Sequence, residues 1–478
     1  MEDNLYITDY LKQHASAIGT KPALVCQDRT LTWAELWHEV EIATTFLNQK
    51  IPSDKQHVVG LLLPNSWQFV VAHLAILNAG HITMPLDPSY KQMEIDPIVA
   101  QIEPVVVITN AKHATNLSTK FPIVLVEQLL NHNLIATDLQ RPQLPPDKQI
   151  ATLLFTSGTT GEPKATPYTH ANHLWNIQAV AKLWDWTPKD TILLSLPLSH
   201  WHGLVMGLSG GIYLGNTIYL QERFDSEATL ATLSSGNISL FMHVPNAYWK
   251  LVNHNPDSQY DISQVRLCIS GSSFLPPAVW KAFKERFKQE ILERYGASET
   301  GLVASNSLLG RIPGSVGHLL PNVRIEIQSD GEIGLESPGL FLGYYKNEDA
   351  TKAKYTSEGW WLTGDIGTFE NNVLTLKGRI QEKIKKFGYT IYPRDVEWAM
   401  LKNPKVKEIV VLGIQKPNSL NDEITYFINS TLTEAEIEEY CKLNLPSAWR
   451  PDKVFFIPEI PKTKSGKPEL AKLKSLIG

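Results

Sequence analysis

The chain has 478 residues, of which 43% are hydrophobic and 19% are charged. It is too long for one compact core and too apolar to be disordered, so we expect two or three domains. The formal net charge of −5 and the dispersed basic residues argue against a nucleic-acid partner.

The N-terminal part of the sequence lacks the pattern of a targeting or membrane segment. It begins Met-Glu-Asp-Asn, without the charged and apolar regions of a signal peptide. The longest apolar stretch, residues 58–86, is broken by Pro64 and several polar residues, so we expect a soluble protein with no membrane partner. Cys26, Cys268 and Cys441 are too far apart for a local disulfide framework or a metal-ligand spacing, which favours a reducing, cytoplasmic location.

The first half of the chain has the pattern of an α/β fold. An apolar run at 58–63, helical periodicity at 67–78 and a second apolar run at 82–86 predict a β-α-β unit. We expect further strands at 105–109, 123–126, 151–156 and 191–196, and a helix at 171–183. This alternation predicts layered α/β subdomains with largely parallel sheets.

The pattern changes twice in the second half. Short alternating strands with Gly and Asn turns, at 324–327, 332–336 and 371–376, predict a small antiparallel β subdomain. After Gly378 a lysine-rich stretch leads into an α+β pattern, with strands at 409–414 and 424–429 and a capping box at Thr433 and Glu436. We therefore predict a large N-terminal domain, residues 1–379, and a small mobile C-terminal domain, residues 380–478.

A loop rich in hydroxyl groups and glycines follows the predicted strand 151–156. Glycines allow close approach of backbone N–H groups to an anion, hydroxyls donate hydrogen bonds, and a lysine adds a positive charge. Glu162 and Pro163 separate the last glycine from the lysine, so the loop is not a Walker A motif. The pattern predicts a phosphate site formed by Thr156, Ser157, Gly158, Thr159, Thr160, Gly161 and Lys164.

The ordered Thr, Ser and Gly residues ending in Pro-Lys resemble the phosphate loop of the adenylate-forming superfamily of acyl-CoA synthetases, peptide-synthetase adenylation domains and luciferases. Four further segments match this superfamily in the right order, so the resemblance covers essentially the whole chain. In the segment 294–300 it implies that the ring of Tyr295 stacks on adenine, Ser298 meets the α-phosphate of ATP and Glu299 holds Mg²⁺. A hard divalent cation prefers carboxylate and phosphate oxygens, which suits this role.

The remaining nucleotide residues come from two later segments. In 361–367 the resemblance implies that Asp365 accepts hydrogen bonds from the ribose, with Arg379 as the second ribose contact. The alternative is a structural Asp–Arg pair across a turn. In 461–467 it implies that Lys467 is the catalytic lysine, bridging the acyl carboxylate and the α-phosphate. The neighbouring Lys462 and Lys464 read as solvated tail charges, the usual fate of a lysine run.

The resemblance also implies a second half-reaction, in which the C-terminal domain rotates and the acyl group passes to a thiol. Gln381 occupies the hinge position, where the family usually has Asp or Lys. We therefore expect the rotation of the C-terminal domain to be altered but not lost. Gly388 matches the glycine beside the pantetheine tunnel. Lys385 and Lys386 either meet the nucleotide phosphates of CoA or form a solvated face.

The segment 196–204 resembles the Pro-x-x-His motif of the family. The resemblance implies that His200 gates access between the nucleotide site and the thiol tunnel, although a lone histidine is more often a core or surface residue. His202 stands where peptide-synthetase adenylation domains carry the aspartate that pairs with the substrate amino group. An amino-acid substrate is therefore disfavoured.

Among acid-thiol ligases, the chain most nearly resembles malonyl-CoA synthetases. The resemblance depends on four local matches, around His202 and at 244–250, 270–272 and 293–296. In that subfamily an arginine at the position of Lys250 and the serine at the position of Ser272 bind the distal carboxylate of the substrate. We expect Gly271, in the segment 270–272, to belong to the ATP site. Because lysine is not bidentate, recognition of a dicarboxylate is weakened or altered.

Two arrangements of the acyl pocket stay open at this point. Lys250 and Arg294 form a buried cationic cluster, which requires an anion and favours a small acidic or polar acyl group. Alternatively, Lys250 points to solvent and Arg294 pairs with Glu293 or another carboxylate.

These observations predict an ATP-dependent, AMP-forming carboxylate ligase. It would form an acyl-adenylate, release pyrophosphate and pass the acyl group to CoA or to the phosphopantetheine of a carrier protein, with an aryl or medium-chain acid as the alternative to a small polar one. The chain has no counterpart of the large insertion of fatty acyl-AMP ligases, which favours CoA. A luciferase-like oxygenase has no separate support, and a noncatalytic descendant is disfavoured because Lys164, Glu299 and Lys467 are all present.

Overall fold

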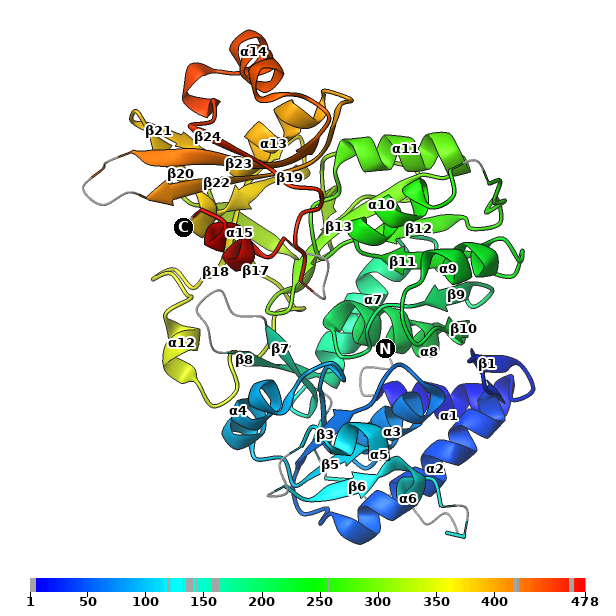
Figure 1. Cartoon of the computed structure of the whole chain (residues 1–478). Helices are drawn as coiled ribbons and strands as arrows, with labels where there is room; N and C mark the ends of the chain where they lie inside the picture. The colour runs from blue at the N-terminus through cyan, green and yellow to red at the C-terminus, as the bar shows by residue number, and fades with distance from the viewer. Residues whose placement is uncertain are drawn as a thin grey trace.

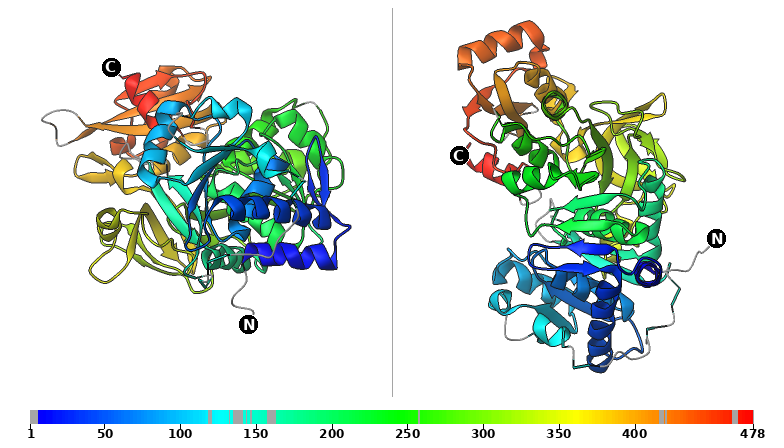
Figure 2. Two further views of the ribbon diagram at one scale, coloured as in Figure 1. Left: turned by 90° about the horizontal axis from the view of Figure 1, so that it is seen from below. Right: turned by 90° about the vertical axis from the view of Figure 1, so that its right-hand side faces the viewer.

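The computed structural model describes residues 6–117, 121–131, 133–134, 141–142, 144–145, 147–156, 163–256, 258–415, 419, 421–463 and 468–477. Two α/β layers lie one above the other, and the C-terminal region lies at the end away from the first layer (Figure 1). The right-hand view of Figure 2 has the same order, from the blue N-terminal layer through green to orange and red. No helix in the described residues has the length and apolar character needed to cross a bilayer.

The first layer is a sheet with strand order β6-β5-β3-β4-β7-β8. Its strands are β3 (Val58–Leu62), β4 (Ile82–Pro85), β5 (Val106–Thr109), β6 (Ile123–Leu125), β7 (Ile150–Thr156) and β8 (Lys164–Thr169). Neighbours are parallel as far as β7, whereas β8 returns antiparallel to β7. The accompanying helices are α1 (Ile7–Ala17), α2 (Trp33–Lys50), α3 (Trp67–Asn78), α4 (Gln92–Ile102), α5 (Ala111–Ala114) and α6 (Val126–Leu129).

Helix α3 shows why the first β-α-β unit was predictable. Ser66 caps it by accepting a hydrogen bond from the N–H of Phe69 at 3.2 Å, and every residue from Phe69 to Asn78 is buried. A helix that is apolar on nearly all sides belongs in a core. The predicted strands at either end of this helix are confirmed as β3 and β4.

The second layer is a sheet with strand order β15-β14-β13-β12-β11-β9-β10-β1-β2. Its strands are β1 (Pro22–Val25), β2 (Thr30–Thr32), β9 (Thr191–Leu194), β10 (Thr217–Leu220), β11 (Leu240–His243), β12 (Leu267–Ser270), β13 (Ile291–Ala297), β14 (Gly301–Ser305) and β15 (His318–Leu319). The strands from β13 to β1 are parallel, and those at both edges are antiparallel. Its helical segments are α7 (His170–Ala181), the π-helix η1 (His202–Ser209), α8 (Gly210–Leu214), α9 (Ser226–Leu233), α10 (Pro245–Asn253) and α11 (Pro277–Phe287).

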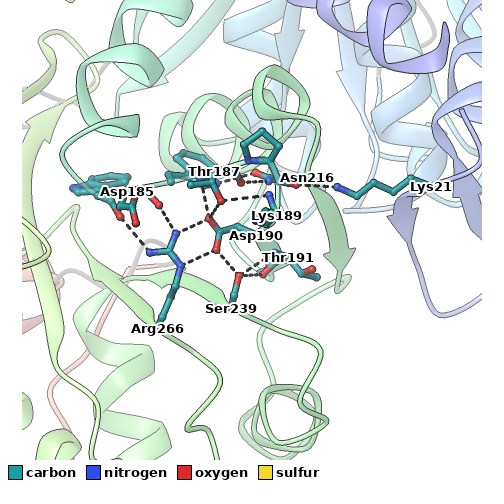
Figure 3. A network of polar contacts seen from close by, with 12 residues as sticks. Lys21, Asp185, Thr187, Lys189, Asp190, Thr191, Asn216, Ser239 and Arg266 are labelled. Carbon is teal, nitrogen blue, oxygen red and sulfur yellow. Dashed lines mark hydrogen bonds and ion pairs between the residues drawn. The ribbon is translucent and has the colours of Figure 1, made fainter. Parts of the chain in front are cut away.

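A polar network ties together the segments at the amino ends of the parallel strands in this second sheet (Figure 3). The carboxylate of Asp190, just before β9, accepts hydrogen bonds from Nε and Nη2 of Arg266 at 2.9 and 2.6 Å and from Oγ of Ser239 at 2.7 Å. Arg266 directly precedes β12 and Ser239 directly precedes β11. This edge of the sheet is therefore occupied by a structural network, which leaves the carboxyl edge for a functional site.

The last two regions match the predicted change of pattern. An antiparallel sheet contains β16 (Arg324–Ile327), β17 (Glu332–Glu336), β18 (Trp361–Glu370) and β19 (Val373–Arg379), with α12 (Glu348–Lys352) beside it. The C-terminal region contains β20 (Ile384–Lys386), β21 (Tyr389–Ile391), β22 (Val406–Gln415), β23 (Asp422–Ser430), β24 (Lys453–Phe456), α13 (Pro393–Leu401), α14 (Glu434–Asn444), α15 (Leu470–Ser475) and the 3₁₀ turns η2 (Ile380–Glu382) and η3 (Ser447–Trp449). Its hydrophobic clusters are separate from those of the two α/β layers. The predicted α/β class with a small α+β C-terminal domain is confirmed.

Candidate active site

The candidate site lies at the carboxyl ends of parallel strands in the second sheet. Strand β9 leads to the segment with His200 and His202, β11 leads to α10 with Lys250, and β12 leads to Gly271 and Ser272. Strand β13 carries Arg294 and Tyr295 and leads to Ser298 and Glu299. Ligands in α/β sheets bind outside this edge, so segments far apart in sequence meet at one site.

Lys164 lies beside the predicted magnesium ligand. It is the first residue of β8 and the register partner of Thr156, so it stands at the base of the phosphate loop. Its Nζ atom lies 4.9 Å from the ring centroid of Tyr344, whose hydroxyl donates to Oε1 of Glu299 at 3.2 Å. Tyr344 thus links Lys164 to Glu299. Tyr344 was not predicted from the sequence, because nothing in the local pattern around it indicates a contact with either residue. The remaining predicted loop residues, Ser157, Gly158, Thr159, Thr160 and Gly161, lie outside the described residues.

The predicted ribose residues form one group, joined to Tyr295 through an ion pair and a hydrogen bond of Asp365. Asp365 on β18 and Arg379 on β19 are register partners, and Nε of Arg379 lies 3.2 Å from Oδ1 of Asp365. The hydroxyl of Tyr295 donates to Oδ2 of the same carboxylate at 2.7 Å. The Asp365 carboxylate raises the pKa of Arg379, so this guanidinium stays charged. The Asp–Arg pair considered from the sequence is therefore present, across a β-ladder, and it brings both residues next to Tyr295.

Arg294 is a buried cation that has no ion-pair partner among the described residues, and its guanidinium carbon lies 5.9 Å from the ring centroid of Trp201. Its residue is 4% exposed, and Nε and Nη2 have no hydrogen-bond partner among the described residues. A Cβ atom at Gly271 would lie 2.4 Å from Nε of Arg294, so glycine makes room for this side chain. Burial lowers the pKa of Arg294 to about 9, which still leaves it mainly charged at neutral pH. Among the described residues this positive charge therefore has no carboxylate partner.

The suggested pairing of Arg294 with Glu293 is wrong. The two residues are consecutive in β13, and successive side chains of a strand point to opposite faces. Glu293 instead accepts a hydrogen bond from the N–H of Gly314 at 3.2 Å. Burial raises the pKa of Glu293 to about 8.

His202 and Ser272 lie with Arg294 on the same side of the site. Oγ of Ser272 is 3.4 Å from Nδ1 of His202, and Nε2 of His202 has no partner among the described residues. Burial, reinforced by the Arg294 charge, lowers the pKa of His202 well below its usual range. Ser272 has a left-handed backbone, with φ of 70°, which places its side chain off the end of β12. A neutral imidazole, a hydroxyl and a guanidinium are thus brought together.

Lys250 does not belong to that buried group. It is exposed and lines a cavity of about 510 Å³ between α10 and the segment 459–463 of the C-terminal region. The buried Lys250–Arg294 cluster considered from the sequence is therefore not observed, because α10 directs Lys250 toward the C-terminal region. His243, at the end of β11, also lines this cavity and was missed; burial lowers its pKa to about 3.

The residues assigned to the second half-reaction lie in different surroundings. His200 is half-buried and lines a small hollow with Asp87 and Phe155. Gln381 lies exposed in η2, and Gly388 is exposed with φ of 77° and open space where a Cβ would stand. Both sequence interpretations of Lys386 are wrong, because its buried Nζ pairs with Asp452 at 2.6 Å.

Lys467 lies outside the described residues, but Lys462 and Pro468, on either side of it in the sequence, are described. Lys462 and Pro468 form an antiparallel β-bridge. The side chain of Lys462 is 15% exposed and contacts Asn246 and Glu408, so the interpretation of Lys462 as a solvated charge is wrong.

Comparison with known families identifies the class of protein. Residues 11–345 match the family described as AMP-binding enzyme, and residues 395–467 match the AMP-binding enzyme C-terminal domain. The first match alone covers more than half of the chain, so the chain belongs to the AMP-binding enzyme family. The prediction of an adenylate-forming enzyme of the acyl-CoA synthetase class is confirmed.

Within this class the chain is similar to ligases named for dicarboxylic acids. It is 27% identical to the mitochondrial malonate–CoA ligase ACSF3 of Bos taurus, over 95% of this chain and 88% of the relative. It is 29% identical to the oxalate–CoA ligase of Arabidopsis thaliana, over 91% of each chain. The crystal structure of ATP-bound MatB from Rhodopseudomonas palustris superposes with a TM-score of 0.90 at 23% identity, over 99% of both chains.

Proposed function

We propose that this enzyme activates a small carboxylic acid bearing a second polar or anionic group, and transfers it to CoA. The observation that carries the proposal is the buried guanidinium of Arg294, whose Nε and Nη2 have no hydrogen-bond partner among the described residues. A buried charge left without a counter-ion is costly. A carboxylate on the substrate would supply both the counter-charge and two charge-assisted hydrogen bonds.

The neighbours of Arg294 support an acidic substrate group. His202 is neutral and carries one N–H, so the pair offers the ligand one donor: Nε2–H of His202 when Nδ1 accepts from Ser272, or the Ser272 hydroxyl when Nδ1–H of His202 donates to it. No carboxylate of a described residue pairs with Arg294, which leaves the anion to come from the ligand. Lys250 would act at longer range from the cavity, as a point charge and not as a bidentate partner. Relatives named as malonate–CoA and oxalate–CoA ligases agree with this substrate class.

For the nucleotide, we assign Lys164 and the loop 156–161 to the phosphates of ATP. Tyr295, Asp365 and Arg379 would hold the nucleoside, with Ser298 at the α-phosphate. Gly271 contributes by leaving space for Arg294 at the edge of this site.

Glu299 fits a magnesium ion that is shared with ATP. Mg²⁺ is commonly held by one or two carboxylates together with substrate phosphates. Glu299 is a half-buried carboxylate linked through Tyr344 to Lys164, so an ion bound there would lie where the phosphates are expected. The ion would neutralise charge as pyrophosphate leaves.

Catalysis would proceed in two conformations. Lys467 would stabilise the charge that develops at the α-phosphate while the substrate carboxylate attacks. The C-terminal domain, residues 380–478, would then rotate at Gln381 and bring Gly388 to the pantetheine tunnel, with His200 as the gate. The exposed position of Gly388 is compatible with a conformation that precedes this rotation.

CoA is the proposed acceptor because the two relatives named as CoA ligases align with this chain over 88% and 91% of their own length. A carrier-protein phosphopantetheine is the alternative acceptor. The cytoplasmic location stays a prediction, since the ACSF3 relatives are named as mitochondrial proteins.

Pyrophosphate release from ATP, measured with short mono- and dicarboxylic acids, tests the proposal. We expect release with a dicarboxylic or hydroxylated acid, and an acyl thioester when CoA is added. Release only with long-chain or aryl acids would contradict the proposed substrate class.

A further inference from the structure

The described residues on the two sides of Lys467 are joined by backbone contacts, which form the base of the segment that contains Lys467. Lys462 and Pro468 form the β-bridge, and the N–H of Glu469 donates to the carbonyl of Pro461 at 2.8 Å. Lys467 is the residue directly before Pro468, so any contact that fixes this base also restricts where Lys467 can reach.

The side chain of Lys462 connects this base to the large domain. Its Nζ donates to Oδ1 of Asn246 at 3.1 Å and lies 5.3 Å from the ring centroid of Trp249. Asn246 and Trp249 are three residues apart on α10, so they share one face of that helix. Nζ also donates to the carboxylate of Glu408 on β22, which belongs to the C-terminal region.

We propose that Lys462 is a positioning residue, which clamps the base formed by Lys462 and Pro468 onto α10 while the acyl-adenylate forms, and thereby positions the adjacent Lys467. This inference rests on the proposed function. Three donors on one ammonium group allow simultaneous contact with Asn246 and Glu408, and the Trp249 ring adds a cation–π contact. The clamp holds this base against α10, the helix that also carries Lys250. Lys462 and Lys250 line the same cavity.

The clamp can open without breaking the contact between Lys462 and Glu408. Glu408 and Lys462 both belong to the C-terminal region and would move together during the rotation, whereas Asn246 and Trp249 would stay with the large domain. Only the contacts to α10 must break before the thiol step. Loss of the clamp should therefore slow adenylate formation and leave thiol transfer unaffected.

The test compares the two half-reactions in the full-length enzyme. We expect Lys462→Ala and Asn246→Ala to lower kcat for pyrophosphate release by up to about 100-fold, the effect of a displacement of about 1 Å of a catalytic group. KM for ATP and the single-turnover rate of CoA acylation from a supplied acyl-adenylate should stay within about twofold of wild type. Lys462→Arg should restore most of the loss, because it keeps the charge and the donors.

Lys405→Ala is the matched control. Lys405 pairs with Glu436 at 3.1 Å, wholly within the C-terminal region, so its loss should change neither half-reaction. Equal losses in both half-reactions, or an unchanged kcat for both clamp variants, would overturn the role of Lys462. If Lys462→Ala misfolds, Asn246→Ala still tests the clamp, because it removes the contact from the α10 side. Failure of the proposed function is distinguishable, because then the wild type itself releases no pyrophosphate with any acid.

Discussion

Replacing Arg294 with methionine should separate stability from activity. The substitution removes a buried charge that has no ion-pair partner among the described residues and retains most of the side-chain volume in the space left by Gly271. Replacing buried charges with well-packed apolar groups is commonly neutral or stabilising. We therefore expect the unfolding free energy of Arg294→Met to equal or exceed that of the wild type.

The expected loss of activity follows from the two unpartnered N–H groups of Arg294, on Nε and Nη2. Hydrogen bonds to charged groups contribute about 1.5–3 kcal/mol each. Losing both in the complex with a dicarboxylic acid would cost about 3–6 kcal/mol, a decrease of roughly 10²- to 10⁴-fold in kcat/KM. A monocarboxylic acid of the same length lacks the group that Arg294 would bind, so its kcat/KM should change little.

The assay is steady-state pyrophosphate release with malonate and with propionate, combined with thermal unfolding of the same preparations. Arg266→Met is the matched control, because Arg266 is a partnered arginine whose loss leaves the buried carboxylate of Asp190 unpaired (Figure 3). We expect the control to be destabilised by about 3–5 kcal/mol, without selective loss of malonate over propionate. Equal effects of Arg294→Met on the two acids, or none, would refute the assignment of Arg294 to the substrate carboxylate.

Further variants test other parts of the account. Lys467→Ala should lower adenylate formation by at least about 100-fold and spare thiol transfer from a supplied acyl-adenylate; equal loss in both assays would contradict its role. Lys250→Met should raise KM for malonate by about 1.5-fold to fivefold, as expected for a contribution of about 0.2–1 kcal/mol from a single exposed charge, and an unchanged KM would remove Lys250 from substrate recognition. Glu293 has a folded-state pKa of about 8, raised by burial above the usual value of 4.5, so the folded protein holds a proton there that the unfolded chain releases. Its contribution to stability is present below pH 4.5 and is lost as the pH rises toward 8. Glu293→Gln should therefore raise the melting temperature more at pH 8 than at pH 5, and a constant difference would show that Glu293 ionises normally.

Periodicity in the sequence predicted the elements whose packing is simple. The helix at 67–78 and its flanking strands are buried on nearly all sides, so their apolar runs are long and unambiguous. The Thr433–Glu436 capping box likewise uses contacts within one turn of α14, and Glu436 N–H donates to Oγ1 of Thr433 at 3.3 Å. The π-helix η1 was not predicted from the sequence; Gly203, within it, packs closely against the backbone of Pro197, a contact that the apolar pattern does not indicate.

Motifs in the sequence identified the candidate site residues but not their partners. The contact of Lys462 with Asn246 joins residues 216 positions apart, and a lysine run carries no signal of such a contact. The surroundings of Arg294 include Trp201, His202 and Gly271, which are distant in sequence, so they could not be inferred from its own segment. Lys250 resembled an arginine of the substrate pocket in sequence, yet its exposure follows from the course of α10 toward the C-terminal region.

The most direct test is acid-dependent pyrophosphate release by the wild-type enzyme with ATP and Mg²⁺, followed by addition of CoA. We predict that a short acid with a second anionic or polar group elicits release and that CoA converts the bound adenylate into the acyl-CoA thioester. If no acid in the panel elicits release above the acid-free rate, the assignment of this chain as a carboxylate-activating ligase is contradicted.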